Sequence, residues 1–205
     1  MSISVKYLGL TPYESTWHEM KNFTSKRNES TQDEIWITEH EAIYTLGLNR
    51  KDFKAPLRDD IPVLHVDRGG KITYHGRGQL IIYLLIDLDR YHLTIRSFVT
   101  LIEKSIIHFL SRRDIKASAK IEAPGVYIGD KKIASLGLRI KNHASYHGLS
   151  LNIDMDLSPF EAIDPCGYKN LQMTQLKTFI NDVSIENTGL EIANDIKHQL
   201  LNLKS

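Results

Sequence analysis

Cysteine is nearly absent from this sequence of 205 residues, which contains only one. A single thiol excludes a disulfide within the chain, and it excludes Cys₄ and Cys₂His₂ zinc sites. Long hydrophobic runs are also missing, since the longest, residues 80–86, is far too short to span a bilayer. The first residues contain no long apolar segment of the kind that forms a signal peptide. We therefore expect a cytoplasmic protein with no membrane partner.

A strong net charge is missing as well. The 26 Lys and Arg residues nearly balance the 25 Asp and Glu residues, and the formal net charge is +1. This balance excludes the strongly basic footprint of a general nucleic-acid binder, so no nucleic-acid partner is expected. The hydrophobic content of 41% is ordinary for a globular protein, and the chain is long enough to bury a core. We expect residues 1–205 to form a single domain, with residues 49–62 as a surface loop within it.

The distribution of apolar residues predicts an α+β fold. Strands are expected at residues 3–10, 34–38, 42–48, 63–66, 79–88, 125–128, 132–140 and 146–153. Helices are expected at residues 94–112 with Thr94 as N-cap, near residues 186–203, and after Thr11, with Thr11 as N-cap and Pro12 in the first turn. Because the strands cluster and several are joined by short turns, a mixed or antiparallel sheet is favoured over repeated βαβ units.

The segment at residues 68–79, RGGKITYHGRGQ, combines four glycines with basic and aromatic residues. Glycine lets the backbone approach a ligand closely, and it also permits the positive φ angles of a tight connection. The spacing matches neither the phosphate-binding P-loop nor the dinucleotide-binding fingerprint. A ligand-binding loop and a purely structural turn therefore both remain open from the spacing alone.

Two further segments contain possible catalytic groups. In GVYIGDKKIASLG, residues 125–137, Lys131 and Lys132 follow a hairpin turn signal, although paired lysines beside a turn are usually a solvated edge. The other is HGLSLNI, residues 147–153, which leads to DPCGY, residues 164–168. A lone cysteine is more often an inert core residue, but Cys166 lies on a turn between proline and glycine, where a thiol is accessible as a nucleophile.

The histidines suggest a metal site or a cysteine–histidine hydrolase as alternatives. His143 and His147 have a spacing found in metal sites, but no acidic residue or third ligand joins them convincingly. His75 and His147 are more simply explained as residues that shape a pocket by hydrogen bonding. We therefore expect no bound metal.

The ordered set of motifs resembles the lipoyl(octanoyl) transferase family. The set comprises RGGKITYHGRGQ, GVYIGDKKIASLG, HGLSLNIDMDL and PCGY, and an upstream stretch, DEIWITEHEAIYTLG, adds to it. The resemblance covers roughly residues 3–179. It implies a fold similar to the catalytic domain of biotin protein ligases, which is a mixed β-sheet with packed helices.

The resemblance also implies roles for individual residues. Cys166 corresponds to the nucleophile, and Lys132, not Lys131, to the lysine that activates it. Strand alternation would put Ala134 and Leu136 on the same face as Lys132. The implied substrate pocket consists of Arg68, Gly69, Gly70, Lys71, Ile72, Thr73, Tyr74, His75, Ser135, Leu136, Gly137, Gly148, Leu149 and Ser150. Two positions depart from the family pattern, because Arg77 replaces a proline and Ser150 an alanine.

The reaction that the resemblance implies moves an octanoyl group from octanoyl-acyl-carrier-protein to a lysine of a lipoyl domain, through a thioester on Cys166. The acceptors are lipoyl domains of 2-oxoacid dehydrogenases and the glycine cleavage H protein, and no cofactor is needed. Two alternatives stay open. The first is an ATP-dependent lipoate or biotin protein ligase of the same fold, for which Arg68, Lys71 and Arg77 would bind phosphates. The second is a non-catalytic module that binds acyl carrier protein.

Overall fold

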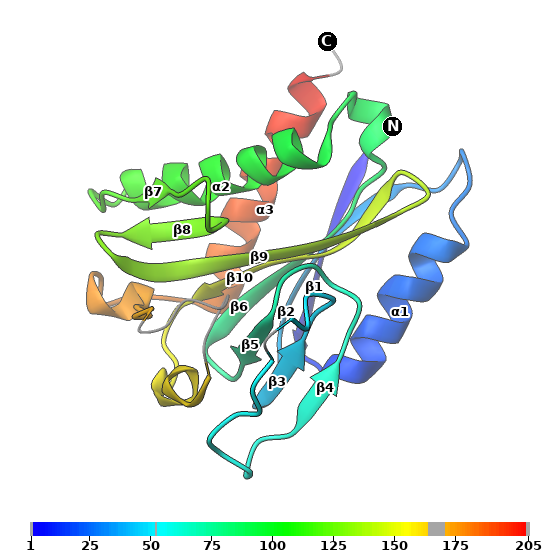
Figure 1. Cartoon of the computed structure of the whole chain (residues 1–205). Coiled ribbons are helices and arrows are strands. Elements are labelled where there is room, and N and C mark those ends of the chain that lie inside the picture. Colours follow the sequence, from blue (N-terminus) through cyan, green and yellow to red (C-terminus); the bar gives the residue numbers. More distant parts are fainter. Residues whose placement is uncertain (1, 52, 164–170, 204–205) are drawn as a thin grey trace.

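A seven-stranded mixed sheet forms the centre of the computed structural model, which describes residues 2–51, 53–163 and 171–203 (Figure 1). In spatial order its strands are β1 (Ile3–Leu10), β2 (Asp33–Glu39), β6 (Gln79–Leu85), β10 (Ala144–Asn152), β9 (Lys131–Lys141), β8 (Gly125–Ile128) and β7 (Ser118–Ala119). β1 and β2 are parallel, and the other neighbours are antiparallel. A smaller sheet has the order β4 (Val63–His65), β3 (Ile43–Leu46), β5 (Ile72–His75). The predicted α+β class with a mixed sheet is confirmed.

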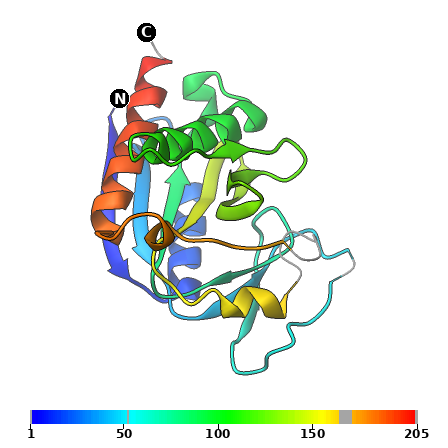
Figure 2. The ribbon, with the colours of Figure 1, turned by 90° about the vertical axis from the view of Figure 1, so that its left-hand side faces the viewer.

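Helices cover both faces of the large sheet. α2 (Ile95–Ser111) and α3 (Ile185–Asn202) lie on one face and α1 (Tyr13–Ser25) lies on the other (Figures 1 and 2). In β6, Leu80 and Ile82 belong to the core beneath α2 and α3. Their neighbours Ile81 and Tyr83 belong to the core beneath α1. A strand covered on both faces needs apolar residues at every position, which explains the unbroken apolar run in the sequence.

Of the two N-caps predicted from the sequence, one is observed in the structure and the other is not. Thr94 caps α2 as predicted, because its Oγ1 accepts a hydrogen bond from the Ser97 N–H at 3.1 Å. The predicted cap of the first helix is wrong, since Pro12 is the N-cap and the helix begins at Tyr13. The Oγ1 of Thr11 instead lies 2.8 Å from the Oγ1 of Thr38, which ties the preceding loop to the end of β2.

Strand ends also depart from the sequence pattern. β6 ends at Leu85 and does not continue to residue 88, because Asp87 caps a short 3₁₀ helix, η1 (Leu88–Tyr91), by accepting a hydrogen bond from the Asp89 N–H. β5 lies inside the glycine-rich segment, where the pattern predicts a loop. After β10 the chain passes through η2 (Ser158–Ala162) and η4 (Leu176–Thr178) before it reaches α3.

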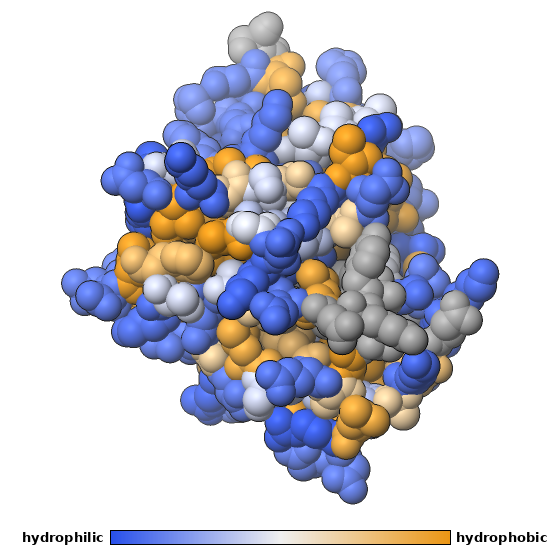
Figure 3. Space-filling model, turned by 60° about the vertical axis from the view of Figure 1, so that its left-hand side comes forward, coloured by the Kyte–Doolittle hydropathy of each residue, from blue (hydrophilic) through white to orange (hydrophobic). Residues whose placement is uncertain are grey.

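Hydrophilic and hydrophobic side chains are interspersed on the face of the molecule shown in Figure 3. The most exposed large apolar residues are Leu57 and Ile121, which lie in two separate connections between strands. No helix among the described residues is long and apolar enough to cross a membrane.

Candidate active site

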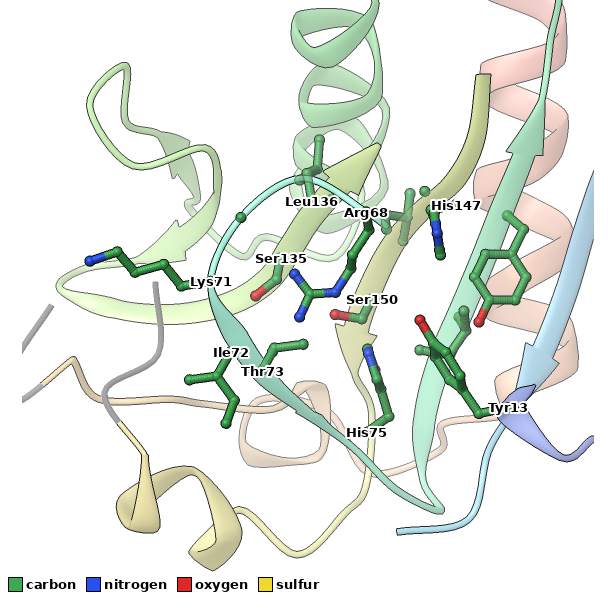
Figure 4. A pocket seen from close by; sticks show the side chains of 16 residues that line it. Tyr13, Arg68, Lys71, Ile72, Thr73, His75, Ser135, Leu136, His147 and Ser150 are labelled. Atoms are coloured by element: carbon green, nitrogen blue, oxygen red, sulfur yellow. The ribbon is translucent and has the colours of Figure 1, made fainter. Parts of the chain in front are cut away.

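A pocket lies where β5 of the small sheet meets β9 and β10 of the large sheet (Figure 4). Its lining consists of Tyr13, Arg68, Gly70, Lys71, Ile72, Thr73, His75, Ile81, Tyr83, Ser135, Leu136, Gly137, His147, Gly148, Leu149 and Ser150. Twelve of the fourteen predicted pocket residues are in this set. Of the other two, Tyr74 packs with Tyr44 and Phe160 in a second core, and Gly69 donates its N–H to the Leu138 carbonyl at 2.9 Å.

Arg68 holds the glycine-rich segment against β3. Its side chain is 7% exposed, and its guanidinium donates to the Oγ1 and the carbonyl oxygen of Thr45 and to the carbonyl of Gly69, with distances from 2.6 to 3.1 Å. Gly47 allows this close approach, because a Cβ there would lie 2.4 Å from the Gly70 carbonyl oxygen. Gly70 itself has a φ of +87°. The segment is therefore a tight connection that also forms a pocket wall, and its role in binding a ligand stays a prediction.

Two buried histidines are held neutral beside the pocket. Burial, with a smaller effect from the Arg68 charge, lowers the pKa of His75 to about 3. Burial likewise lowers the pKa of His40 to about 4. The ring of His75 stacks on Tyr13 with 5.4 Å between centroids, and its Nδ1 lies 2.7 Å from the Gln79 Oε1. At neutral pH the His75 ring lines the pocket, while His40 lies 2.7 Å from the Oη of Tyr83, and neither ring adds charge.

Asp67 organises the opposite wall. Its carboxylate accepts hydrogen bonds from Trp17 Nε1 at 2.8 Å, Tyr146 Oη at 2.6 Å and His147 Nε2 at 3.1 Å. Burial disfavours the ionised form, but these hydrogen bonds outweigh it and hold the pKa of Asp67 well below its usual range. His147 has a φ of +58° and is 1% exposed, so its ring is fixed in the pocket wall.

Several polar side chains reach into the pocket. In Figure 4, Arg68, Ser135 and Ser150 point toward one shared space, while Lys71 extends away from it. Ser150, one of the two departures from the family pattern, therefore adds a hydroxyl to the pocket itself. Arg77, the other departure, lies outside the pocket lining. Its Nε donates a hydrogen bond to the carboxylate of the exposed Glu41 at 2.9 Å.

Lys132 is completely buried at the start of β9. Its Nζ donates to the Pro124 carbonyl at 2.9 Å and lies 5.4 Å from the centre of the Tyr127 ring. Its backbone N–H donates to the Gln172 carbonyl, and its own carbonyl accepts from the Thr174 N–H, both at 2.9 Å. Lys132 is thus joined to the segment that follows the PCG motif in the chain.

The predicted arrangement of side chains around Lys132 is wrong. Lys132 pairs with Tyr127 of β8, but Ala134 pairs with Val126, so Ile133 is an extra residue in β9. Because Tyr127 and Val126 are neighbours on β8, their side chains point to opposite faces. This bulge interrupts strand alternation, and Ala134 lies in the core beneath α2 and α3 while Lys132 lies across from Tyr127.

Cys166 lies outside the described residues. The chain is described up to Ile163 and again from Leu171, and Gln172 is six positions beyond the cysteine. Among the described residues, no group of three or more His, Cys, Asp or Glu side chains could hold a metal ion.

Tyr13, Ile81 and Tyr83 line the pocket but belong to none of the motifs. Tyr13 comes from the first turn of α1 and the other two from β6. Ile81 and Tyr83 share the face of β6 that turns toward α1, but the unbroken apolar run of this strand does not distinguish its two faces in the sequence.

Comparison with known proteins shows likeness along nearly the whole chain. The sequence pattern of the family described as the lipoyl protein ligase A/B catalytic domain matches residues 12–197. An octanoyltransferase from Hydrogenovibrio crunogenus is 50% identical over 203 residues, which cover 98% of this chain and 97% of that protein.

Solved structures share the fold at much lower identity. A bi-partite lipoate protein ligase from Thermoplasma acidophilum, described with its E2 lipoyl domain, has a TM-score of 0.76 and 16% identity, covering 98% of this chain and 84% of that one. A biotin protein ligase from Aquifex aeolicus in complex with biotin and ATP has a TM-score of 0.63 and 13% identity. The match covers 100% of this chain and 72% of that one. The predicted similarity to the biotin protein ligase catalytic domain is confirmed.

Proposed function

This chain belongs to the lipoyl protein ligase A/B catalytic domain family and is an acyltransferase of protein lipoylation; on that premise we propose that it carries an octanoyl group as a thioester on Cys166. The donor is octanoyl-acyl-carrier-protein. The acceptor is a lysine of lipoyl domains, those of 2-oxoacid dehydrogenases and the glycine cleavage H protein. Residues 1–205 act as one catalytic domain, and no cofactor takes part.

The observation that carries this proposal is the placement of Lys132. β9 contributes Lys132 at its start and the pocket residues Ser135, Leu136 and Gly137 three to five positions later. The backbone of Lys132 is also hydrogen-bonded to Gln172 and Thr174. The six positions between Cys166 and Gln172 span at most about 20 Å when extended. A buried lysine on a strand that also lines the pocket, joined to the chain that follows the cysteine, supports the cysteine–lysine pair.

The reaction proceeds in two half-reactions. A free thiol has a pKa of about 8.5, so a neighbouring ammonium on Lys132 increases the thiolate fraction at neutral pH. The Cys166 thiolate attacks the thioester carbonyl of the donor, and the new carbon–sulfur bond replaces the bond to the carrier. The departing carrier thiolate takes a proton from the Lys132 ammonium, which becomes a neutral amine.

In the second half-reaction the neutral amine of the lipoyl-domain lysine attacks the acyl-enzyme. An amide bond forms and the carbon–sulfur bond to Cys166 breaks. Lys132 accepts the proton that the attacking amine loses, so the ammonium–thiolate pair is restored. Because a thioester is converted to an amide, no ATP is required. The E2 lipoyl domain described with the Thermoplasma ligase supports a lipoyl domain as acceptor.

Intact mass after mixing with octanoyl-acyl-carrier-protein tests the proposal. One octanoyl group should be added to the protein and removed by hydroxylamine, and Cys166→Ala should keep its fold and lose the adduct. An adduct that persists in Cys166→Ala would exclude the thioester on this residue. A wild-type protein that binds the carrier and gains no adduct would favour the non-catalytic module.

The ATP-dependent ligase needs basic groups available to phosphates, and two of the three candidates are engaged in other contacts. Arg68 is bonded to Thr45 and Gly69, and Arg77 is paired with Glu41. Lys71, the third candidate, extends away from the space that Arg68, Ser135 and Ser150 share (Figure 4). Octanoyl transfer to a lipoyl domain without added ATP distinguishes the two reactions, since the ligase would show none.

A further inference from the structure

Glu103 is an acidic residue in the buried face of α2. Its neighbours Ile102 and Ile106 belong to the main core, and Glu103 is only 8% exposed. A carboxyl group in such a position destabilises the protein unless hydrogen bonds or a charge compensate for its lost hydration. The groups that contact the Glu103 carboxyl group should therefore explain how its burial is compensated.

Glu103 and Lys132 meet at one peptide unit. The Oε1 of Glu103 accepts a hydrogen bond from the N–H of Gly125 at 2.9 Å. The Nζ of Lys132 donates to the carbonyl oxygen of Pro124, also at 2.9 Å. The Pro124 carbonyl and the Gly125 N–H belong to the same peptide group. Glu103 therefore binds its N–H and Lys132 binds its carbonyl oxygen.

Gly125 keeps this peptide close to the lysine. Its φ is +141°, and a Cβ there would lie 2.4 Å from the Cε and 3.0 Å from the Nζ of Lys132. A side chain at position 125 would displace the lysine or the peptide. The stem of Lys132 thus passes directly over Gly125, and its ammonium ends at the carbonyl of the preceding residue.

We propose that Glu103 is a positioning residue, which fixes the ammonium of Lys132 through the Pro124–Gly125 peptide. This inference rests on the proposed role of Lys132. An acceptor on the N–H side of a peptide polarises the unit and makes its carbonyl a stronger acceptor, because linked hydrogen bonds reinforce one another. The Lys132 Nζ is therefore held at a fixed point, from which it protonates the leaving thiolate and later takes up the proton of the incoming amine.

The electrostatics of Glu103 agree with this contact. Burial raises the pKa of Glu103, whereas the hydrogen bond from Gly125 and the charge of Lys132 act in the opposite direction. Substitution can separate the effect of the acceptor oxygen from the effect of the negative charge, because glutamine keeps the oxygen and lacks the charge.

Three variants test the proposal. Glu103→Leu removes the acceptor and should lower kcat for octanoyl transfer roughly tenfold, the size expected for one buried hydrogen bond to a charged network, with KM for octanoyl-acyl-carrier-protein unchanged. Glu103→Gln keeps an acceptor oxygen at the same distance along the side chain and should restore most of that loss. Ser105→Ala is the matched control, because Ser105 is also buried on the same helix but accepts a hydrogen bond from Gln199 of α3 at 2.7 Å.

A double-mutant cycle with Lys132→Ala separates positioning from general damage to the fold. In the Lys132→Ala background, Glu103→Leu should cause no further loss, because the residue it positions is gone. A full additional loss in that background would overturn the proposal, and so would a Glu103→Gln variant as slow as Glu103→Leu. If Lys132→Ala alone leaves transfer unchanged, the role of Lys132 fails instead, whatever the Glu103 variants do.

Discussion

Lys131 and Lys132 are neighbours in β9 but lie in opposite surroundings, because Lys131 is exposed and Lys132 is completely buried. Adjacent strand residues point to opposite faces, so only one of the two side chains can take part in a buried pair. The Lys132 side chain donates to the Pro124 carbonyl, and its backbone is hydrogen-bonded to the segment that follows the PCG motif.

Replacing Lys132 by alanine should therefore make Cys166 less reactive. Loss of the ammonium should raise the pKa of the thiol toward about 8.5 and slow its alkylation at neutral pH. Lys131→Ala should do neither. The pH dependence of iodoacetamide alkylation reports this directly, because the sequence has no other cysteine. A curve shifted by Lys131→Ala and unchanged in Lys132→Ala would refute the assignment.

A large side chain at Ser150 should shorten the acyl chain that the enzyme prefers. Ser150 lines the pocket, so Ser150→Leu should exclude part of an octanoyl chain at a cost of about 0.8 kcal/mol per displaced methylene. Butanoyl transfer should be nearly unaffected. Transfer rates with donors of four and eight carbons measure the difference, and equal losses for both would argue against burial of the chain here.

Gly148, which also lines the pocket, should behave differently. A Cβ at Gly148 would lie 2.0 Å from the carbonyl oxygen of Ile82, where β10 pairs with β6. Gly148→Ala should therefore destabilise the sheet, by roughly 1–3 kcal/mol, and reduce transfer of all chain lengths alike. Thermal unfolding of Gly148→Ala beside Ser150→Leu checks this, and an unchanged melting temperature would contradict it.

Acidification should destabilise the fold below pH 6.5. The pKa values of His75 and His40 are lowered to about 3 and about 4, mainly by burial, from 6.5. The unfolded chain therefore binds more protons in this range, and the free energy of unfolding falls as pH drops from 6.5 toward 3. His75→Asn, which can still bond Gln79, should show a shallower decline. Melting temperatures from pH 7.5 to 4.5 for both proteins measure the slopes, and parallel slopes would show that His75 does not contribute.

Chelation should leave octanoyl transfer unchanged. The proposed steps use only a thiol and an amine, and the described residues contain no cluster of metal-binding side chains. Transfer assayed after dialysis against a chelator tests this expectation. Activity that is lost and then restored by zinc would point to a metal-dependent reaction.

Elements with a clear period were predictable from the sequence. The apolar stripe and Thr94 predict α2 almost residue for residue. Most of the pocket lining is implied by the resemblance to the lipoyl(octanoyl) transferase family, and not by periodicity. The bulge at Ile133 was not predictable, because one extra residue leaves the local pattern of small and apolar side chains unchanged.

Residues that depend on tertiary contacts were also missed. Tyr13 joins the pocket only because α1 packs across the large sheet, and nothing near it in the sequence indicates this. Glu103 resembles a surface residue of an amphipathic helix until the peptide that it binds is known. Such roles arise from segments that are distant in the chain, so local periodicity carries no information about them.

The pairing of β10 with β6 also has a kinetic consequence. These strands contribute Ile81, Tyr83, Gly148 and Ser150 to the pocket, yet they are widely separated in the chain, with α2 and the β8–β9 hairpin between them. Closing so long a loop has an entropic cost that must be met before the contacts form, and non-local sheet pairing slows folding. The acyl pocket should therefore be among the last parts of the molecule to assemble. A nascent chain whose synthesis has not yet reached β10 would lack the pocket altogether.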